Sequence, residues 1–130
     1  MRSYFLLFIL GTLIGCGESF DHDKMLASKR AVEFADATFV RGNLDQGYAM
    51  MADKARSYVP LNIFTDKVSK MHPSGRPSKS TVQSVDPVKG EKIVNVVLRG
   101  EGDEQFTYSI SVIGSAASDY GVSRFSGGRG

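Results

Sequence analysis

One stretch of the sequence, residues 39–51, reads FVRGNLDQGYAMM and carries the main evidence for the fold. The apolar residues that precede it recur at helical spacing and predict an amphipathic helix over residues 23–41. Gly42 and Asn43 tolerate left-handed backbone geometry, so this helix is expected to end there. A second amphipathic pattern follows at once over residues 44–56. The stretch therefore predicts two helices that are joined by a very short break.

The residues beside each helix start are typical helix caps. Asp21 or Asp23 can accept a hydrogen bond from the first turn of the first helix, and Asn43 or Asp45 can do so for the second. Pro60 breaks the second helical pattern but suits the first turn of a third helix. The apolar residues of this short amphipathic helix recur at spacings of three and four residues, and they are Leu61, Phe64, Val68 and Met71. These signals predict three helices in the first half of the chain.

After a loop rich in Pro and Gly at residues 72–78, the pattern changes to that of an antiparallel sheet. Residues 106–112 alternate between apolar and small polar side chains, as a strand with one buried face does. The predicted strands cover residues 81–85, 91–99, 106–112 and 120–125. Helices followed by a meander of strands predict the α+β class.

The whole chain has the size and composition of one globular domain. It has 130 residues, of which 42% are hydrophobic and 23% are charged, which is close to the globular average. A single domain is expected over residues 23–126, with Phe64 and Val96 in its core and a flexible tail over residues 127–130. The 16 basic and 14 acidic residues are spread along the chain. We expect no nucleic-acid partner, because such a partner would need a basic stripe.

Residues 39–51 combine a helix end, Gly-Asn and a new helix that starts near an aromatic residue. In this they resemble the nuclear transport factor 2-like superfamily, also called cystatin-like or ketosteroid isomerase-like. The resemblance covers residues 23–125 and implies N-terminal helices packed on a curved antiparallel sheet that forms a cone. The final strands are expected to be short, with Tyr120 or Phe125 as the aromatic residue near the end of the sheet, which implies a shallow pocket. Many small lipoproteins with such domains have no known function, so the resemblance implies a shape rather than an activity.

The first fifteen residues, 1–15, have the pattern of a secretory signal. Arg2 supplies a positive charge, an apolar run follows over residues 4–10, and small residues end it. The sequence LIGC at residues 13–16 resembles the lipobox of bacterial lipoproteins, in which a branched residue precedes the cysteine by three positions. This resemblance implies cleavage before Cys16 and lipidation of Cys16, whose thiolate can accept a diacylglyceryl group. A plain secretory signal, or a core helix with an incidental cysteine, is the alternative.

Cys16 is the only cysteine in the chain. In an exported protein it could not form an internal disulfide, whereas lipidation would give it a role as the membrane anchor. Residues 16–22 are expected to form a lipidated tether of flexible composition. Gly17, rather than Asp, follows the cysteine. By the sorting rule of enteric bacteria, this implies the periplasmic face of the outer membrane if the host is Gram-negative.

Catalytic members of the superfamily use an Asp, or a His–Asp pair, inside the cone. The candidates in this sequence are Asp36, Asp45, Asp53, His22 and His72. The three Asp residues stand among basic residues, which favours a solvated helix face. One histidine lies in the expected tether and the other in a loop, so both are expected to be exposed. No catalytic residue is assigned on this basis.

The remaining motifs favour structural roles. Tyr48, Met50 and Met51 could line an apolar pocket, but core packing is the preferred interpretation. Gly100 and Gly102 lie between two predicted strands, which indicates a hairpin turn rather than a phosphate-binding loop. Two histidines and one cysteine at these spacings form no metal-binding motif, and no cofactor is expected.

Together, these patterns favour a lipid-anchored protein of the cell envelope that binds a partner and catalyses no reaction. Its partners would be the membrane, through lipidated Cys16, and an envelope protein or a small apolar ligand. One alternative is an envelope enzyme of the ketosteroid isomerase-like kind, and another is a protective or immunity lipoprotein that binds an incoming effector. An Asp or His side chain inside a closed apolar cavity would favour the enzyme.

Overall fold

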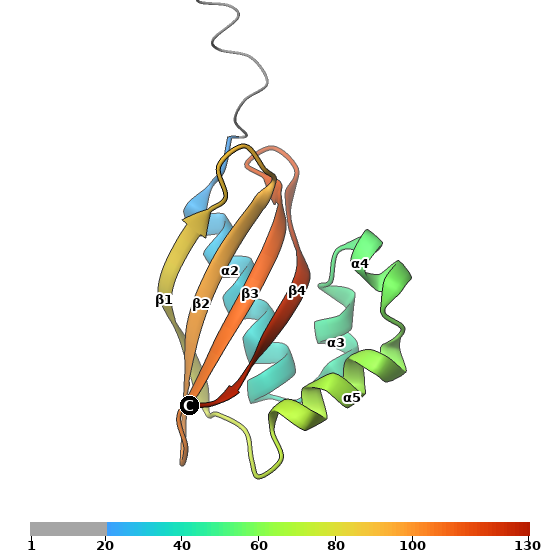
Figure 1. The fold of residues 1–130 in the computed structure, drawn as a ribbon, viewed down its shortest axis with the longest axis vertical. Helices are drawn as coiled ribbons and strands as arrows, with labels where there is room; N and C mark the ends of the chain where they lie inside the picture. The colour runs from blue at the N-terminus through green and yellow to red at the C-terminus, as the bar shows by residue number, and fades with distance from the viewer. Residues whose placement is uncertain (1–20) are drawn as a thin grey trace, which may run out of the picture.

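The computed structural model describes residues 21–130. The predicted signal segment, Cys16 and the predicted tether up to Phe20 lie outside the described residues. Within the described part, helices come first and a four-stranded antiparallel sheet follows (Figure 1). The predicted α+β class is confirmed.

The sheet is a meander in which each strand pairs with the next one along the chain. Its strands are β1 (Lys79–Pro87), β2 (Ile93–Glu101), β3 (Phe106–Ser115) and β4 (Asp119–Arg129). Along the first seven residues of β3, buried and more exposed side chains alternate. The predicted strand with one buried face is therefore confirmed.

The last strands are longer than the sequence indicated, and residues 127–129 are not a flexible tail. They continue β4, with Gly127 opposite Tyr108 and Gly128 opposite Thr107 on β3. Gly127 has a φ of 134°, a backbone conformation that glycine adopts without a steric penalty. A Cβ atom at this position would lie 2.2 Å from the carbonyl oxygen of Thr107. The glycines that suggested a tail instead allow the two strands to approach closely, so the predictions of a tail and of short final strands were wrong.

The first predicted helix has two parts. α2 (Lys24–Ala35) continues without a break into η1 (Asp36–Val40), a turn of π-helix. Asp23, one of the two predicted caps, accepts a hydrogen bond from the backbone N–H of Leu26 at 3.0 Å. In the wider π turn, the N–H of Arg41 donates to the carbonyl of Asp36 at 2.9 Å. Gly42 then ends the segment with a φ of 68°, in the left-handed conformation that the sequence predicted.

The second predicted helix, over residues 44–56, is in fact two short helices. α3 (Leu44–Ala49) is capped by Asn43, whose side chain accepts from the N–H of Gln46, and α4 (Asp53–Tyr58) follows after a break. At the break, the N–H of Ala52 donates to the carbonyl of Val122 at 2.7 Å, and the N–H of Val122 donates to Met50. The prediction of one continuous helix was wrong because this segment pairs with the edge of β4 instead. Covering an edge strand satisfies backbone groups that would otherwise be unpaired.

The third helix is α5 (Leu61–Met71), which agrees with the predicted pattern. Pro60 is its N-cap and lies just before the first turn. Phe64, Val68 and Met71 are buried, as their spacing indicated, whereas Leu61 at the start is 40% exposed. The prediction that Phe64 is a core residue is confirmed.

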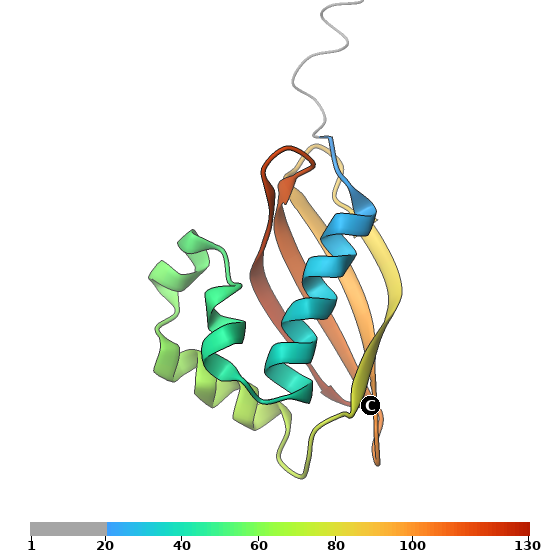
Figure 2. The same cartoon turned by 180° about the vertical axis from the view of Figure 1, so that it is seen from behind.

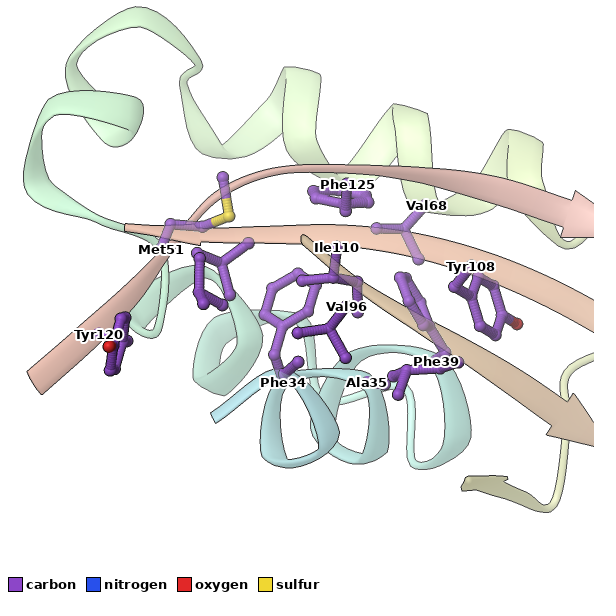
Figure 3. Close-up of a cluster of buried hydrophobic side chains, with 14 of the residues drawn as sticks. Phe34, Ala35, Phe39, Met51, Val68, Val96, Tyr108, Ile110, Tyr120 and Phe125 are labelled. Carbon is purple, nitrogen blue, oxygen red and sulfur yellow. The ribbon is translucent and has the colours of Figure 1, made fainter. Parts of the chain in front are cut away.

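The helices and the sheet form two layers around one core. α2 lies across one face of the sheet, and α3, α4 and α5 lie beyond the β4 edge (Figure 2). Phe34 is at the centre of the core, with ring centroids 5.2 Å from Phe125, 5.7 Å from Phe39 and 6.2 Å from Phe64. Figure 3 shows how side chains from α2, α5 and the strands meet there. Val96 on β2 is fully buried in the same core, as predicted.

Candidate functional site

The three candidate carboxylates lie in three different environments. Asp45 and Asp53 are exposed, and Asp53 forms an ion pair with Arg56 three residues later. These two agree with the predicted solvated helix face. Asp36 does not, because it is half-buried and its carboxylate accepts a hydrogen bond from the Ser80 hydroxyl at 2.9 Å. Asp36 therefore links the π turn to β1, and the prediction of a solvated position was wrong for it.

His22 is half-buried rather than exposed. The hydroxyl of Tyr120 accepts from the N–H of Asp23 at 3.0 Å and is hydrogen-bonded to Nδ1 of His22 at 2.8 Å. The other ring nitrogen, Nε2, donates to the carbonyl of Glu91 at 2.8 Å. The N–H of Ala116 donates to the carbonyl of Asp21 at 2.7 Å. The predicted tether is therefore wrong at its last two residues: Asp21 binds to the turn between β3 and β4, and His22 binds to Tyr120 on β4 and to the turn between β1 and β2.

His72 is also half-buried, at the C-terminal end of α5. Its Nδ1 donates to the carbonyl of Val68 at 2.9 Å, and its Nε2 accepts from the hydroxyl of Tyr108 at 2.7 Å. The rings of Phe39 and Phe106 lie 5.3 and 5.4 Å from it. The prediction that His72 is exposed was wrong, because this side chain caps the helix and pairs with a buried tyrosine.

The surroundings of this pair favour the neutral forms of both side chains. Burial lowers the pKa of His72; the hydrogen bond to Val68 opposes this effect, and the charge of Arg76 adds to it. Burial raises the pKa of the Tyr108 hydroxyl. A neutral imidazole whose Nδ1 is protonated can donate to one partner and accept from the other. The pair is therefore a satisfied hydrogen-bond network within the wall of the core.

One signal in the sequence could have identified this pair. Tyr108 occupies an inward-facing position of the alternating strand β3, and a buried tyrosine hydroxyl needs a hydrogen-bond partner. His72 stands four residues after Val68, so it can reach the free carbonyl groups at the end of α5. The pairing of the two side chains could not be predicted, because it depends on how α5 packs against the sheet.

The apolar candidates are mainly core residues. Met51 is buried, and the half-buried Tyr48 donates its hydroxyl to the carbonyl of Val59 at 2.7 Å while its ring packs on Phe64. Core packing is therefore confirmed for Met51. Met50 is half-buried and lines an open cleft of about 610 Å³ between the α3–α4 segment and the β3–β4 hairpin.

Two arginines line this cleft, and internal partners engage both. Arg30 donates two hydrogen bonds to the carboxylate of Asp119, each at 2.9 Å, and a third to Glu33. These bonds lower the pKa of Asp119. Arg56 pairs with Asp53 and donates to the carbonyl of Met51 at 2.7 Å. Because their charges are compensated within the chain, these arginines stabilise the cleft walls rather than offer free charges to a ligand.

A smaller cavity of about 180 Å³ lies beside His72. It is also lined by Arg76, Ser69 and Thr38. The Thr38 hydroxyl is fully buried and has no hydrogen-bond partner among residues 21–130. It lies against Gly47, where an added Cβ atom would be only 1.9 Å away. The hydroxyl therefore marks a tight contact between η1 and α3.

Comparisons with known proteins add no assignment: no protein-family model matches this chain, and no curated protein matches it. Among residues 21–130, no three or more His, Cys, Asp or Glu side chains group in a way that could hold a metal ion. No helix in the same part of the chain is long and apolar enough to cross a membrane.

Proposed function

We propose that this chain is a lipid-anchored protein of a bacterial cell envelope and that its domain works by binding. The anchor is a diacylglyceryl group on Cys16, added after recognition of the sequence LIGC at residues 13–16. Two acyl chains supply the stable membrane attachment that a single chain does not. With glycine after the cysteine, the domain faces the periplasm from the outer membrane if the host is Gram-negative.

The contacts of Asp21 support a domain that is held close to the membrane. Asp21 is bonded to the turn between β3 and β4 through Ala116. Only four residues separate Asp21 from Cys16, and the five residue steps from Cys16 to Asp21 span at most about 18 Å. The turn between β3 and β4 would then lie at the membrane end of the molecule.

We also infer that the domain is a small member of the nuclear transport factor 2-like fold. The order of its elements supports this: a long first helix that packs across an antiparallel meander, with further helices beside the last strand. In such a cone, a ligand pocket would lie between the helices and the sheet. Here Phe34, Phe39, Phe64 and Phe125 lie in that position and are buried.

This filled interior is the observation that carries the proposal of a binding function. A catalytic acid or base must be within hydrogen-bond reach of its substrate. Asp45 and Asp53 are exposed on the helices, while Asp36 and His22 are bonded to the Ser80 and Tyr120 hydroxyls. Binding at the outer surface fits this arrangement better than turnover inside the cone.

One observation favours the enzyme as a second candidate. His72 lines the small cavity beside Arg76, and its pKa is lowered by burial. A neutral imidazole beside a cation has the properties of a general base. Its two ring nitrogens are already bonded to Val68 and Tyr108, so a substrate would have to displace one of these partners.

The test is genetic complementation with alanine variants at His22, Asp36, Asp45, Asp53 and His72. We expect each variant to rescue the phenotype of a gene deletion, because loss of a general acid or base would cost about 10²–10⁴-fold in rate whereas a binding surface spreads its energy. Tyr108→Phe is the matched control for His72→Ala, since both remove the same hydrogen bond. If His72→Ala alone failed to rescue the phenotype while remaining folded and lipidated, the result would contradict the binding function and favour the enzyme.

A further inference from the structure

The face of the sheet opposite α2 has a groove of about 580 Å³ at its border with α5. In Figure 1 this face lies in front of α2, with α5 beside β4. The polar residues that line the groove come from one helix and three strands, and they are Lys67, Asn95, Ser109, Ser111, Arg124 and Ser126. We call it the sheet groove.

The pairing of the strands brings these residues together. Asn95, Ser111 and Arg124 are direct neighbours across β2, β3 and β4, and Ser109 is opposite Ser126 in the adjacent row of the same face. Opposite residues of an antiparallel pair have Cβ atoms about 5 Å apart, and successive rows on one face are about 7 Å apart. The five side chains therefore lie within a single small area.

The sheet groove contains two cations without a counter-ion. Lys67 extends from α5 with its ammonium group 4.5 Å from the centre of the Phe125 ring, and this contact holds it at the groove wall. Neither Lys67 nor Arg124 forms an ion pair with any residue of the described chain. Burial, and secondly the charge of Arg124, lower the pKa of Lys67. The two cations are thus close enough to repel each other.

The neutral groups of the groove add further donors. The Ser111 hydroxyl donates to Oδ1 of Asn95 at 2.7 Å. This bond uses the amide oxygen of Asn95, so its amide N–H groups can donate to another acceptor. The hydroxyls of Ser109 and Ser126 have no hydrogen-bond partner among residues 21–130. None of the residues that line the groove is acidic. Glu91 lines an adjoining hollow that shares Asn95, Ser111 and Arg124 with the groove, but it forms no ion pair with Arg124.

We propose that the sheet groove binds the phosphate group of a soluble ligand. Two cations, two free hydroxyls and an amide supply more donors than a carboxylate can accept, whereas a phosphate has three strongly accepting oxygens. An anion between Lys67 and Arg124 would also relieve their mutual repulsion. Only two cations are present, so the groove suits one phosphate group rather than a polyanion.

The position of the groove favours a soluble ligand over a lipid headgroup. The groove residues Ser111 and Ser109 lie about 14 and 20 Å along β3 from Ser115, at the turn that faces the membrane end. This part of the inference rests on the proposed anchor, whereas the binding of phosphate does not. Failure of phosphate binding would leave the complementation test of the proposed function unaffected, so the two can fail separately.

The experiment measures binding of inorganic phosphate to the full chain in a non-ionic detergent by equilibrium dialysis. We expect saturable binding with a dissociation constant of about 1 mM or lower. Lys67→Gln and Arg124→Gln should each weaken it about tenfold or more, because each removes a charge-assisted hydrogen bond. Arg99→Gln is the matched control. Arg99 is exposed and lies on the same face of β2 as Asn95, two rows away, but it does not line the groove.

A second arm distinguishes the source of the phosphate. The full chain is reconstituted in vesicles of phosphatidylcholine, with or without a minor fraction of phosphatidylglycerol. Because the groove lies farther from the lipid surface than the Debye length of about 8–10 Å, the affinity for phosphate should be the same in both. A tenfold lower affinity for phosphate in the anionic vesicles would indicate that a lipid headgroup occupies the groove, and it would contradict the proposal of a soluble ligand. Absence of saturable binding, or equal losses in Arg99→Gln and Arg124→Gln, would overturn the site itself.

Discussion

Gly47 of α3 packs tightly against Thr38 of η1. Glycine is normally unfavourable inside a helix, by about 1 kcal/mol relative to alanine. Here, however, the Thr38 side chain occupies the space where a Cβ atom of residue 47 would lie, 1.9 Å from Oγ1. The steric conflict outweighs the gain in helix propensity, which explains a glycine in the middle of α3.

The first prediction follows from this contact. Gly47→Ala should lower the free energy of unfolding by about 1–3 kcal/mol, the usual cost of overpacking, as measured by urea denaturation. In a Thr38→Ala background, the same substitution should cost much less, because the clashing Oγ1 atom is gone and only the Cβ atom of residue 38, 3.0 Å away, remains close. An equal cost in both backgrounds would show that this contact is not the cause.

His72 makes the stability of the protein depend on pH. Burial is the main cause of its lowered pKa, and Arg76 adds to the effect. The unfolded chain therefore takes up a proton on this residue at a higher pH than the folded chain does. By linkage, the stability that His72 contributes is complete above the unfolded pKa of about 6.5 and is lost as the pH falls through and below that value.

The second prediction uses this dependence. The free energy of unfolding should decrease between about pH 6.5 and pH 5, above the range where most carboxylates titrate. His72→Gln should show a weaker decrease in this range, because glutamine can still accept from Tyr108 but does not titrate. Identical pH profiles for the two proteins would contradict the role given to His72.

Among the secondary-structure elements, β4 differs most from what its composition suggests. The segment from Ser126 to Gly130 contains three glycines and one arginine after its serine, which is typical of a chain terminus. It nevertheless pairs with β3 up to the pair of Phe106 and Arg129. The ladder itself is formed by backbone groups, which no local side-chain pattern predicts. Two contacts with residues on or beside β3 add to it: the Thr107 hydroxyl donates to the Gly130 carbonyl at 2.7 Å, and Arg129 forms an ion pair with Glu104.

The third prediction concerns the end of β4. The backbone amides of residues 127–129 that face β3 should exchange with solvent much more slowly than those of an unfolded peptide, because they are held in the ladder. Residue-resolved hydrogen exchange measures this directly, and the exposed amide of Gly75 in the 72–78 loop is an internal reference. Unprotected amides throughout residues 127–129 would restore the flexible tail that the sequence indicated.

Local signals in the sequence were predictive, whereas long-range ones were not. Asp23 and Asn43 cap their helices, and Phe64 and Val96 are buried, because caps and buried faces depend on nearby residues. The break between α3 and α4 was missed because its cause, Val122, is far along the chain. The histidines were misjudged for the same reason: His22 and His72 bond to tyrosines 98 and 36 residues away.

Considered as a whole, the molecule has two distinct ends and one polar face. The start of the described chain is bonded to the β3–β4 turn through Asp21, and to Tyr120 at the start of β4 through His22. The sheet groove opens on the face that α2 does not cover, away from this turn. A short tether at the turn would leave the groove accessible to solutes of the periplasm. The proposed anchor and the proposed ligand site are therefore compatible.

The anchor at Cys16 is the most directly testable part of the proposed function. Intact-mass spectrometry of the protein from native envelopes should find a chain that begins at Cys16 and carries a diacylglyceryl group. Cys16→Ser should remain as an uncleaved precursor or move to the soluble fraction, because it lacks the thiol that accepts the lipid. An unmodified Cys16 in the wild-type protein would contradict the account.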